Sequence, residues 1–177
     1  MKIKIIAAIG KNNELGNSGG LPLWKLRSDF ERFKNLTTGG VVVMGRKTFE
    51  SLPEKFRPLP NRRNIILTRD ENYKVEGAES FRSLEDLIKS PPNPLFKKEG
   101  EHPQDLWIIG GGEIYKQFID KADELHITHV GGDFEADTFF PKIDEEMWEI
   151  LSKEEILADE KNSHFSVYTV YKKHEPR

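Results

Sequence analysis

The chain has 177 residues, with 27 lysines and arginines against 30 aspartates and glutamates, so its net charge is −3. This length suits one domain, which we expect to span residues 1–177, and the balanced charge argues against nucleic acid as a partner. The chain has no cysteine, which excludes disulfides, thiolate metal sites and cysteine catalysis and fits a reducing compartment.

The first predicted element is a strand over residues 3–9, near the N-terminus of the chain. This segment is too short, and its pattern alternates too regularly, for a signal peptide. No apolar run in the sequence is long enough to cross a membrane. We therefore expect a cytoplasmic protein.

A long irregular stretch follows the first strand. Residues 10–23 contain glycines at positions 10, 16, 19 and 20. A loop of this length in a compact domain is usually functional. After it, residues 24–36 are predicted to form an amphipathic helix, because Phe30, Phe33 and Leu36 fall on one face at about 100° per residue.

Asp29 is the unusual residue of this helix. It lies four residues before Phe33 and seven before Leu36, so it falls within the apolar arc, where an acid must find a partner or hold a proton. A second interpretation is a capping box, with Ser28 as the N-cap and Glu31 at the third helical position, in which Asp29 is a first-turn acid favoured by the helix dipole. The two interpretations are compatible, since a carboxylate at a helix start can also face a ligand.

The rest of the pattern alternates strands and helices. Further strands are expected over residues 41–44, 64–68, 106–109, 124–130, 147–155 and 164–172. Further helices are expected over residues 46–52, 83–89 (with Ser83 as N-cap) and 113–119. Four prolines exclude regular structure from residues 90–103, which we interpret as an exposed insertion. This order predicts an α/β fold with a single domain: a mostly parallel central sheet flanked by helices, with an antiparallel C-terminal strand hairpin.

Glycines and cations follow three of the predicted strands. Gly110–Gly112 separates a buried strand from a helix, where free N–H groups can hold phosphate, although a tight turn alone would also favour glycine. Met44–Thr48 and Thr68–Arg69 place cations and hydroxyls at two more strand ends. Ligands bind at the carboxyl ends of strands in such sheets, so these junctions together favour a ligand with several phosphates.

Two other groups of polar residues are less informative. A proline-rich turn over residues 58–64 carries Arg62 and Arg63, which suit an anionic substrate group but equally suit a basic surface loop. His126 and His129 are three apart on a predicted strand, so their side chains leave opposite faces and no metal site is expected.

Taken together, these segments resemble bacterial dihydrofolate reductases over nearly the whole chain. The matching segments are Ile6–Ala8, Leu15–Gly16, Leu21–Pro22, the Asp29 helix, Val43–Ser51, Arg57–Leu67, Ile109–Gly112, Leu125–His129, Asp137–Pro141 and Asn162–His164. The resemblance implies NADPH-dependent reduction of 7,8-dihydrofolate to 5,6,7,8-tetrahydrofolate, by hydride transfer to C6 with protonation at N5, in the service of one-carbon metabolism. It also implies antifolates as inhibitors, and we expect a monomer with no nucleic-acid or membrane partner.

The resemblance also implies roles for individual residues. Asp29 falls at the family's active-site carboxylate, where it would accept paired hydrogen bonds from the pterin and favour protonation of N5 through water. Thr128 would hydrogen-bond Asp29, while Leu21 and Trp24 would belong to a mobile lid over the nicotinamide. Arg62 would grip the substrate's α-carboxylate, and the Gly110–Gly111 peptide would be cis.

The full sets of implied contacts are larger. Besides Asp29 and Thr128, the implied substrate contacts are Ile6, Ala8, Phe30, Phe33, Leu52, Leu59, Arg62, Ile109 and Tyr115. The implied cofactor contacts are Ala8, Leu15, Gly16, Gly45, Arg46, Lys47, Thr48, Leu67, Thr68, Arg69, Ile109, Gly110, Gly111, Gly112, Glu113, Ile114 and Tyr115. The family pattern implies no metal.

Two departures from the family pattern concern the lid and the cofactor. Leu23 separates Pro22 from Trp24, which the family usually has side by side, and Glu113 stands where a cation would help to bind phosphate. Two alternative functions stay open at this point. One is a riboflavin-pathway pyrimidine reductase of similar fold, and the other is a non-catalytic nucleotide-binding module. The implied slot for the benzoyl group, lined by Phe33, Leu52 and Leu59, and the implied carboxylate contact of Arg62 argue against the pyrimidine reductase.

Overall fold

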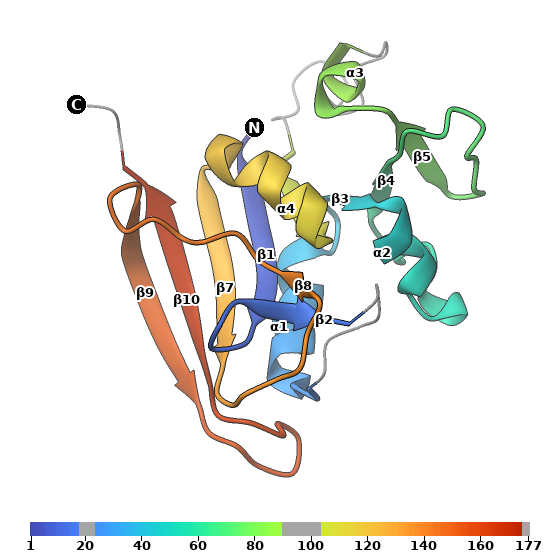
Figure 1. The fold of residues 1–177 in the computed structure, drawn as a ribbon. Helices are drawn as coiled ribbons and strands as arrows, with labels where there is room; N and C mark the ends of the chain where they lie inside the picture. The colour runs from blue at the N-terminus through green and yellow to red at the C-terminus, as the bar shows by residue number, and fades with distance from the viewer. Residues whose placement is uncertain (18–23, 90–103, 175–177) are drawn as a thin grey trace.

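The structure is a computed structural model of the chain and describes residues 1–17, 24–89 and 104–174. An eight-stranded sheet, in the order β5-β4-β3-β6-β1-β7-β10-β9, is flanked by helices on both faces (Figure 1). The predicted insertion at 90–103 and the lid residues Leu21, Pro22 and Leu23 lie outside the described residues.

The helices and strands follow the predicted order closely. The large sheet contains β1 (Ile3–Ile9), β3 (Val41–Gly45), β4 (Arg63–Leu67), β5 (Ala78–Phe81), β6 (Leu106–Gly110), β7 (Glu124–Val130), β9 (Trp148–Ile156) and β10 (Ser166–Lys173). A two-stranded sheet pairs β2 (Glu14–Gly16) with β8 (Thr138–Phe139). The helices are α1 (Arg27–Thr37), α2 (Arg46–Ser51), α3 (Leu84–Lys89) and α4 (Gly112–Phe118), with 3-10 turns η1 (Glu54–Phe56) and η2 (Ile119–Lys121).

The directions of the strands confirm the predicted fold class. Strands β5, β4, β3, β6, β1 and β7 are parallel, each to its neighbour. Strand β10 is antiparallel to both β7 and β9, which forms the expected C-terminal hairpin. The chain starts in the middle of the sheet, so the connections after β1 and after β6 build outward in opposite directions.

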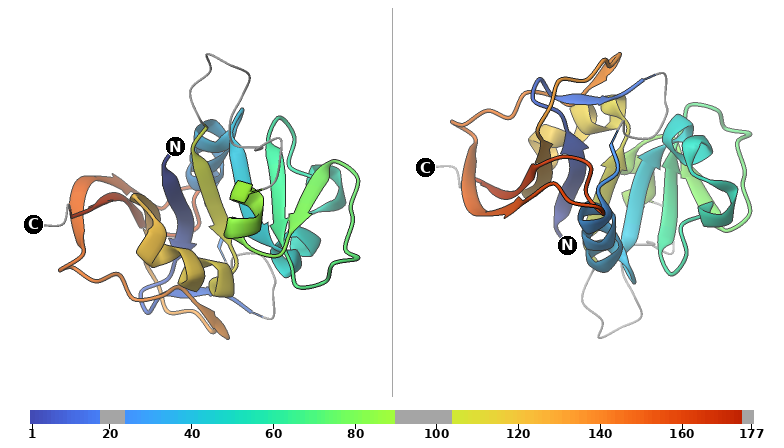
Figure 2. Two further views of the ribbon diagram at one scale, coloured as in Figure 1. Left: turned by 90° about the horizontal axis from the view of Figure 1, so that it is seen from above. Right: turned by 90° about the horizontal axis from the view of Figure 1, so that it is seen from below.

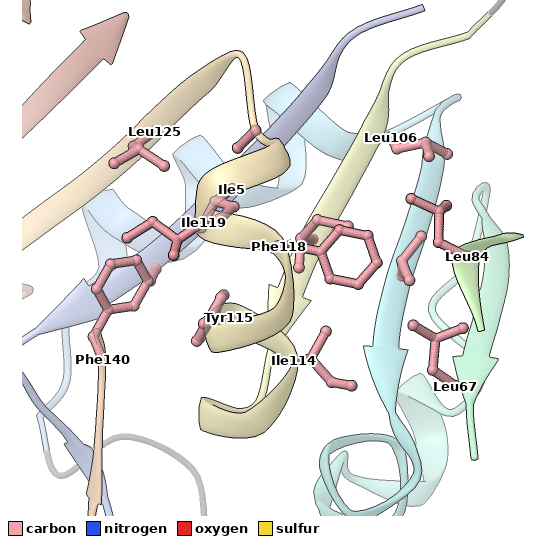
Figure 3. Close-up of a cluster of buried hydrophobic side chains, with 14 of the residues drawn as sticks. Ile5, Leu67, Leu84, Leu106, Ile114, Tyr115, Phe118, Ile119, Leu125 and Phe140 are labelled. Carbon is pink, nitrogen blue, oxygen red and sulfur yellow. The ribbon is translucent and has the colours of Figure 1, made fainter. Parts of the chain in front are cut away.

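Two hydrophobic layers cover the two faces of the sheet. One layer packs α3 and α4 against the strands, and Ile114, Tyr115, Phe118 and Ile119 reach from α4 and η2 to the sheet (Figure 3). The other layer contains Phe49 of α2, with Phe33 and Leu36 of α1 packed against it. Two further views show α1 and α4 on opposite faces (Figure 2). Residues 41–44 are fully buried between the layers, which confirms the prediction of a central strand.

The start of α1 differs from the prediction. The helix begins at Arg27 rather than at residue 24, and its N-cap residue makes no capping hydrogen bond through its side chain, so the capping box of Ser28 and Glu31 is wrong. A distant segment satisfies the first N–H groups instead: the N–H of Arg27 donates to the Lys161 carbonyl at 3.2 Å, and that of Ser28 to Asn162 Oδ1 at 3.1 Å. Glu31 pairs with Arg27 at 2.9 Å rather than serving the cap.

Other local predictions fare better. Ser83 does cap α3, because its Oγ accepts a hydrogen bond from the Asp86 N–H at 3.1 Å. The Gly110–Gly111 peptide is cis, as the resemblance implied. Residues 10–23, predicted to be irregular, include strand β2, and strand β5 was not predicted at all.

Candidate active site

The register of the sheet brings the predicted strand-end motifs to one edge. Met44 of β3 pairs with Gly110 of β6, and Gly45 pairs with Leu67 of β4. On the other side, Ala8 of β1 pairs with Thr128 of β7. Because these strands are parallel, their carboxyl ends lie together, which is where ligands bind in α/β sheets. Segments far apart in the sequence therefore meet at a single site.

Asp29 lies at this site, hydrogen-bonded to a neighbouring strand. Thr128, which is buried on β7, donates its hydroxyl to Asp29 Oδ1 at 2.5 Å. Burial raises the pKa of Asp29 above its usual value, while the hydrogen bond from Thr128 and the charge of Arg32 act against that shift. The result is a carboxyl group that can accept hydrogen bonds from a ligand and that gains a proton more readily than an exposed aspartate.

Tyr115 is close enough to Asp29 to feel its charge, but its hydroxyl has a structural task. The hydroxyl donates to the Ile6 carbonyl at 2.8 Å and so ties α4 to β1. Burial, and secondarily the Asp29 charge, raise the pKa of Tyr115. Its ring packs against Phe140 with centroids 4.9 Å apart. Tyr115 therefore lines the strand ends with an uncharged side chain.

Five of the implied apolar substrate contacts meet in one cluster. Ile6 and Leu59 are buried in it, and Phe33, Leu52 and Ile109 pack against it. Ala8 and Tyr115 pack in other clusters. Phe30 is 56% exposed and does not join the apolar stripe that the helical period predicted. The gathered side chains come from β1, α1, β6 and the segment between α2 and β4, and they suit the aromatic part of a ligand.

Arg62 is held at the end of this cluster. Its Nε donates to Thr37 Oγ1 at 2.8 Å and its Nη1 to the Pro60 carbonyl at 2.7 Å. The guanidinium carbon lies 5.6 Å from the Phe33 ring centroid. A buried amide, which the sequence did not reveal, fixes the turn behind it: Asn64 bonds both the N–H and the carbonyl of Leu59, at 3.0 and 2.9 Å. A preoriented arginine of this kind suits a carboxylate.

The two glycine junctions lie against each other. A Cβ on Gly111 would lie 3.0 Å from Thr48 Oγ1, and one on Gly45 would lie 3.1 Å from Ile114 Cγ1. A Cβ on Gly112 would meet Thr138 at 2.9 Å, with Leu15 at 3.8 Å. The backbone thus approaches closely here only because side chains are missing. The small β2–β8 sheet, which contains Gly16, covers the same region.

Cations surround these junctions. Arg46, Lys47 and Arg69 are exposed, and Thr68 follows β4 directly. Arg46 lies 5.8 Å from the Tyr73 ring centroid. Glu113 is the one acid among the implied cofactor contacts. Its carboxylate pairs with Lys116 at 3.0 Å, and this cation offsets its negative charge. The donors and cations therefore fit an anionic dinucleotide.

Trp24 is the part of the predicted lid that the structure describes beside the site. It is buried with Leu26 and Val130, and Ala8 packs against this group. Its ring meets the edge of Phe134 at 4.8 Å between centroids. Leu21, the other predicted catalytic residue of the lid, lies outside the described residues.

Arg32, a cation on the same helix as Asp29, was not among the predicted site residues. The available signal was its spacing, since a residue three positions after Asp29 lies on the same side of a helix. Within residues 1–17, 24–89 and 104–174, no group of three His, Asp or Glu side chains is placed to hold a metal ion. No helix in that part of the chain is long and apolar enough to cross a membrane.

Comparisons with known proteins agree on one family. The family model described as dihydrofolate reductase matches residues 2–173. A dihydrofolate reductase from Staphylococcus aureus is 38% identical over 175 residues, which cover 98% of this chain and 100% of that protein. One from Staphylococcus haemolyticus is 34% identical, covering 98% and 96%. Among solved structures, dihydrofolate reductase from Enterococcus faecalis, complexed with NADP(H) and RAB-propyl, matches with a TM-score of 0.84 and 33% identity, covering 98% and 97%.

Proposed function

The chain belongs to the dihydrofolate reductase family and is an NADPH-dependent dihydrofolate reductase, and from this premise we propose which of its residues carry the reaction. The family, fold class, activity and cofactor predicted from the sequence are confirmed, and neither the pyrimidine reductase nor the non-catalytic module is supported. When bound, NADPH supplies the hydride that is transferred to C6 of the substrate.

Asp29 is the residue on which the proposal chiefly rests. Its carboxylate accepts paired hydrogen bonds from the pterin, a geometry in which both oxygens contribute. Thr128 holds one of these oxygens at 2.5 Å and thereby sets the orientation of the group. The raised pKa of Asp29 lets the site hold a proton near the substrate, from which N5 is protonated through water.

The rest of the substrate lies along the cluster of Ile6, Phe33, Leu52, Leu59 and Ile109. Their packing in one layer supports this assignment. Arg62 stands at the end of the layer and binds the α-carboxylate, and its hydrogen bonds to Thr37 and Pro60 keep it oriented before the substrate arrives. Phe30, Ala8 and Tyr115 complete the pterin side of the site.

The cofactor lies across the glycine junctions. Gly111 packs closely against Thr48 and Gly45 against Ile114, and the lack of a side chain at glycine lets a pyrophosphate approach the backbone. Arg46, Lys47, Thr48, Thr68 and Arg69 bind its phosphates and adenosine end. Leu15, Gly16, Leu67, Gly110, Gly112 and Glu113 line the same path, while Trp24 and Leu21 help to close the lid over the nicotinamide.

The wider setting follows from the same proposal. We propose that residues 1–177 act as one domain, in a cytoplasmic monomer that supplies tetrahydrofolate to one-carbon metabolism. The ligands are small molecules, and folate analogues that present a diaminopyrimidine to Asp29 inhibit the enzyme.

One absorbance assay tests this proposal. NADPH oxidation is followed with and without dihydrofolate, for the native enzyme and for Asp29→Asn. We expect the variant to fold and bind NADPH but to lose more than about 100-fold in turnover at neutral pH. Glu31→Gln, on the exposed side of the same helix, is the matched control and should be unaffected. Normal turnover by Asp29→Asn would contradict the role given to this residue.

A further inference from the structure

Arg32 is a largely buried cation to which the proposed reaction assigns no role. Its side chain is only 16% exposed. Its guanidinium carbon lies 4.0 Å from the ring centroid of Tyr168, and Nη2 donates to Glu154 Oε2 at 2.7 Å. Nη1 is buried and has no hydrogen-bond partner in the part of the chain that the structure describes. A guanidinium fixed in this way is more than a solvated surface charge.

The sheet register explains how Arg32 comes to be aligned with the site. Thr128 of β7 pairs with Tyr168 of β10, and Tyr168 pairs in turn with Glu154 of β9. Residues directly opposite one another point to the same face of a sheet. These three side chains therefore form a row, and α1 places Asp29 against Thr128 and Arg32 against Tyr168 and Glu154. The acid and the cation are bound to adjacent members of one row.

The groups that face Asp29 come from four elements. Thr128 from β7 donates a hydrogen bond, and Tyr115 from α4 and Tyr168 from β10 are neutral hydroxyl groups whose pKa values the Asp29 charge helps to raise. Arg32, from the same helix as Asp29, is the cation whose charge acts on the carboxyl group. Burial opposes the ionised form of Asp29, so a nearby fixed cation bears directly on its charge.

We propose that Arg32 is a positioning residue of the reaction, which holds Asp29 in the ionised form that binds the pterin, and that its stacking on Tyr168 fixes the guanidinium for this purpose. The inference rests on the proposed role of Asp29 and deepens it. Glu154, which pairs with Arg32, carries a negative charge, and by Coulomb's law we expect that charge to offset part of the field of Arg32 at Asp29. The strength of that field is set by the balance between these two charges.

A purely structural ion pair between α1 and β9 is the alternative, and it predicts a different pattern of effects. If the pair only ties the helix to the edge strand, removing either partner has the same small consequence for stability. If Arg32 acts through its charge, removing Arg32 and removing Glu154 move Asp29 in opposite directions. The sign of the two effects therefore separates the two roles.

The experiment measures the titration of the Asp29 carboxyl carbon by NMR in Arg32→Gln, Arg32→Lys and Glu154→Gln, each with NADPH bound. We expect the Asp29 midpoint to move to higher pH in Arg32→Gln, to lower pH in Glu154→Gln, and to stay near the native value in Arg32→Lys. Arg27→Gln, which removes an exposed cation from the same helix, is the matched control and should not move it. Shifts of the same sign in Arg32→Gln and Glu154→Gln would overturn the proposal.

A binding measurement gives an independent readout. The dissociation constant of a 2,4-diaminopyrimidine antifolate is measured across pH, and the ratio of Arg32→Gln to native enzyme is taken at each pH so that the ligand's own titration cancels. We expect this ratio to rise about three- to tenfold from alkaline to acidic pH. A ratio that is independent of pH would mark Arg32 as merely structural.

Two further comparisons keep the outcomes distinct. If Arg32→Gln does not fold, the direction of the Asp29 shift in Glu154→Gln still tests the proposal. If the native enzyme does not oxidise NADPH when dihydrofolate is added, the proposed function itself fails. If the native enzyme is active, Asp29→Asn is inactive and the Arg32 variants leave the Asp29 midpoint unchanged, only the inference about Arg32 fails.

Discussion

Replacing Thr128 with valine should lower the free energy of unfolding by an amount that depends on the charge of Asp29. The substitution keeps the shape of a buried β-branched side chain but removes the hydroxyl that donates to Asp29 Oδ1 at 2.5 Å. Because the same bond orients the carboxylate, the variant should also reduce dihydrofolate more slowly.

The size of the effect follows from the type of bond. A hydrogen bond to a charged group contributes about 1.5–3 kcal/mol to stability. Burying the methyl group of valine in place of the hydroxyl stabilises the fold by about 0.8 kcal/mol. The net loss in the free energy of unfolding should therefore be about 1–2 kcal/mol while Asp29 is ionised. When Asp29 is protonated, the bond is a neutral one, worth about 0.5–1.5 kcal/mol, so the loss should shrink at acidic pH.

A double-mutant cycle measures this coupling. Urea unfolding at neutral pH is compared for the native protein, Thr128→Val, Asp29→Asn and the double variant, and kcat/KM is measured for the first two. We expect the valine substitution to cost about 1 kcal/mol less in the Asp29→Asn background, because the asparagine side chain is a neutral acceptor. In the native background kcat/KM should fall about tenfold, the equivalent of 1.4 kcal/mol.

The control is Thr169→Val, at a buried threonine of β10 whose partner in the sheet is Ile127. Its cost should be the same in the native and the Asp29→Asn backgrounds. Equal costs for Thr128→Val in both backgrounds, or a cost that does not change with pH, would refute the assignment of the bond to the ionised carboxylate.

Three other expectations follow from burial and charge. Asp29→Asn should raise the free energy of unfolding at neutral pH. The folded pKa of Asp29 lies above its unfolded value, so the stability that this group contributes at low pH is lost as pH rises through the folded pKa. Chemical unfolding at acidic and at neutral pH checks the sign of this effect. Glu124 is the opposite case: burial disfavours its charge, but hydrogen bonds from Lys2 and His126 and the charge of Lys4 outweigh burial and lower its pKa from 4.5 to about 2. The native protein should therefore lose stability as pH falls from about 4.5 towards 2. In Glu124→Gln the melting temperature should depend less on pH over this range. Gly112→Ala should destabilise the fold by about 1–3 kcal/mol, because its Cβ would lie 2.9 Å from Thr138 Cγ2, and a normal melting temperature would contradict that contact.

Local patterns in the sequence predicted most of the large sheet and the edge at which the site lies. The four apolar residues 41–44 predicted a strand buried on both faces, and the glycines and cations after the strands predicted the edge at which the candidate site lies. Strand β5 carried no such signal, since Ala78–Phe81 is only four residues long and pairs along a single edge of β4.

The start of α1 could not be predicted from neighbouring residues. Ser28 and Glu31 have the spacing of a capping box, but the first N–H groups of the helix are satisfied by Lys161 and Asn162. These partners are far away in the chain, as the separation of 134 positions between Ser28 and Asn162 shows. A tertiary contact has displaced a local motif, which no reading of the helix alone reveals.

The same holds for Arg32. Its spacing from Asp29 was visible in the sequence, but its role depends on Tyr168 and Glu154 being opposite each other in β10 and β9. Register of this kind is fixed by the packing of whole strands rather than by any short motif.

The origin of the α1 cap also bears on when the candidate site can form while the chain is being synthesised. Asp29 leaves the ribosome before Thr128, Asn162 and Tyr168, which contact the helix and its acid from positions much later in the chain. Contacts with such long sequence separation form late and slowly. We therefore expect the nascent chain to carry Asp29 without these partners until β7 and β10 have been synthesised and have docked.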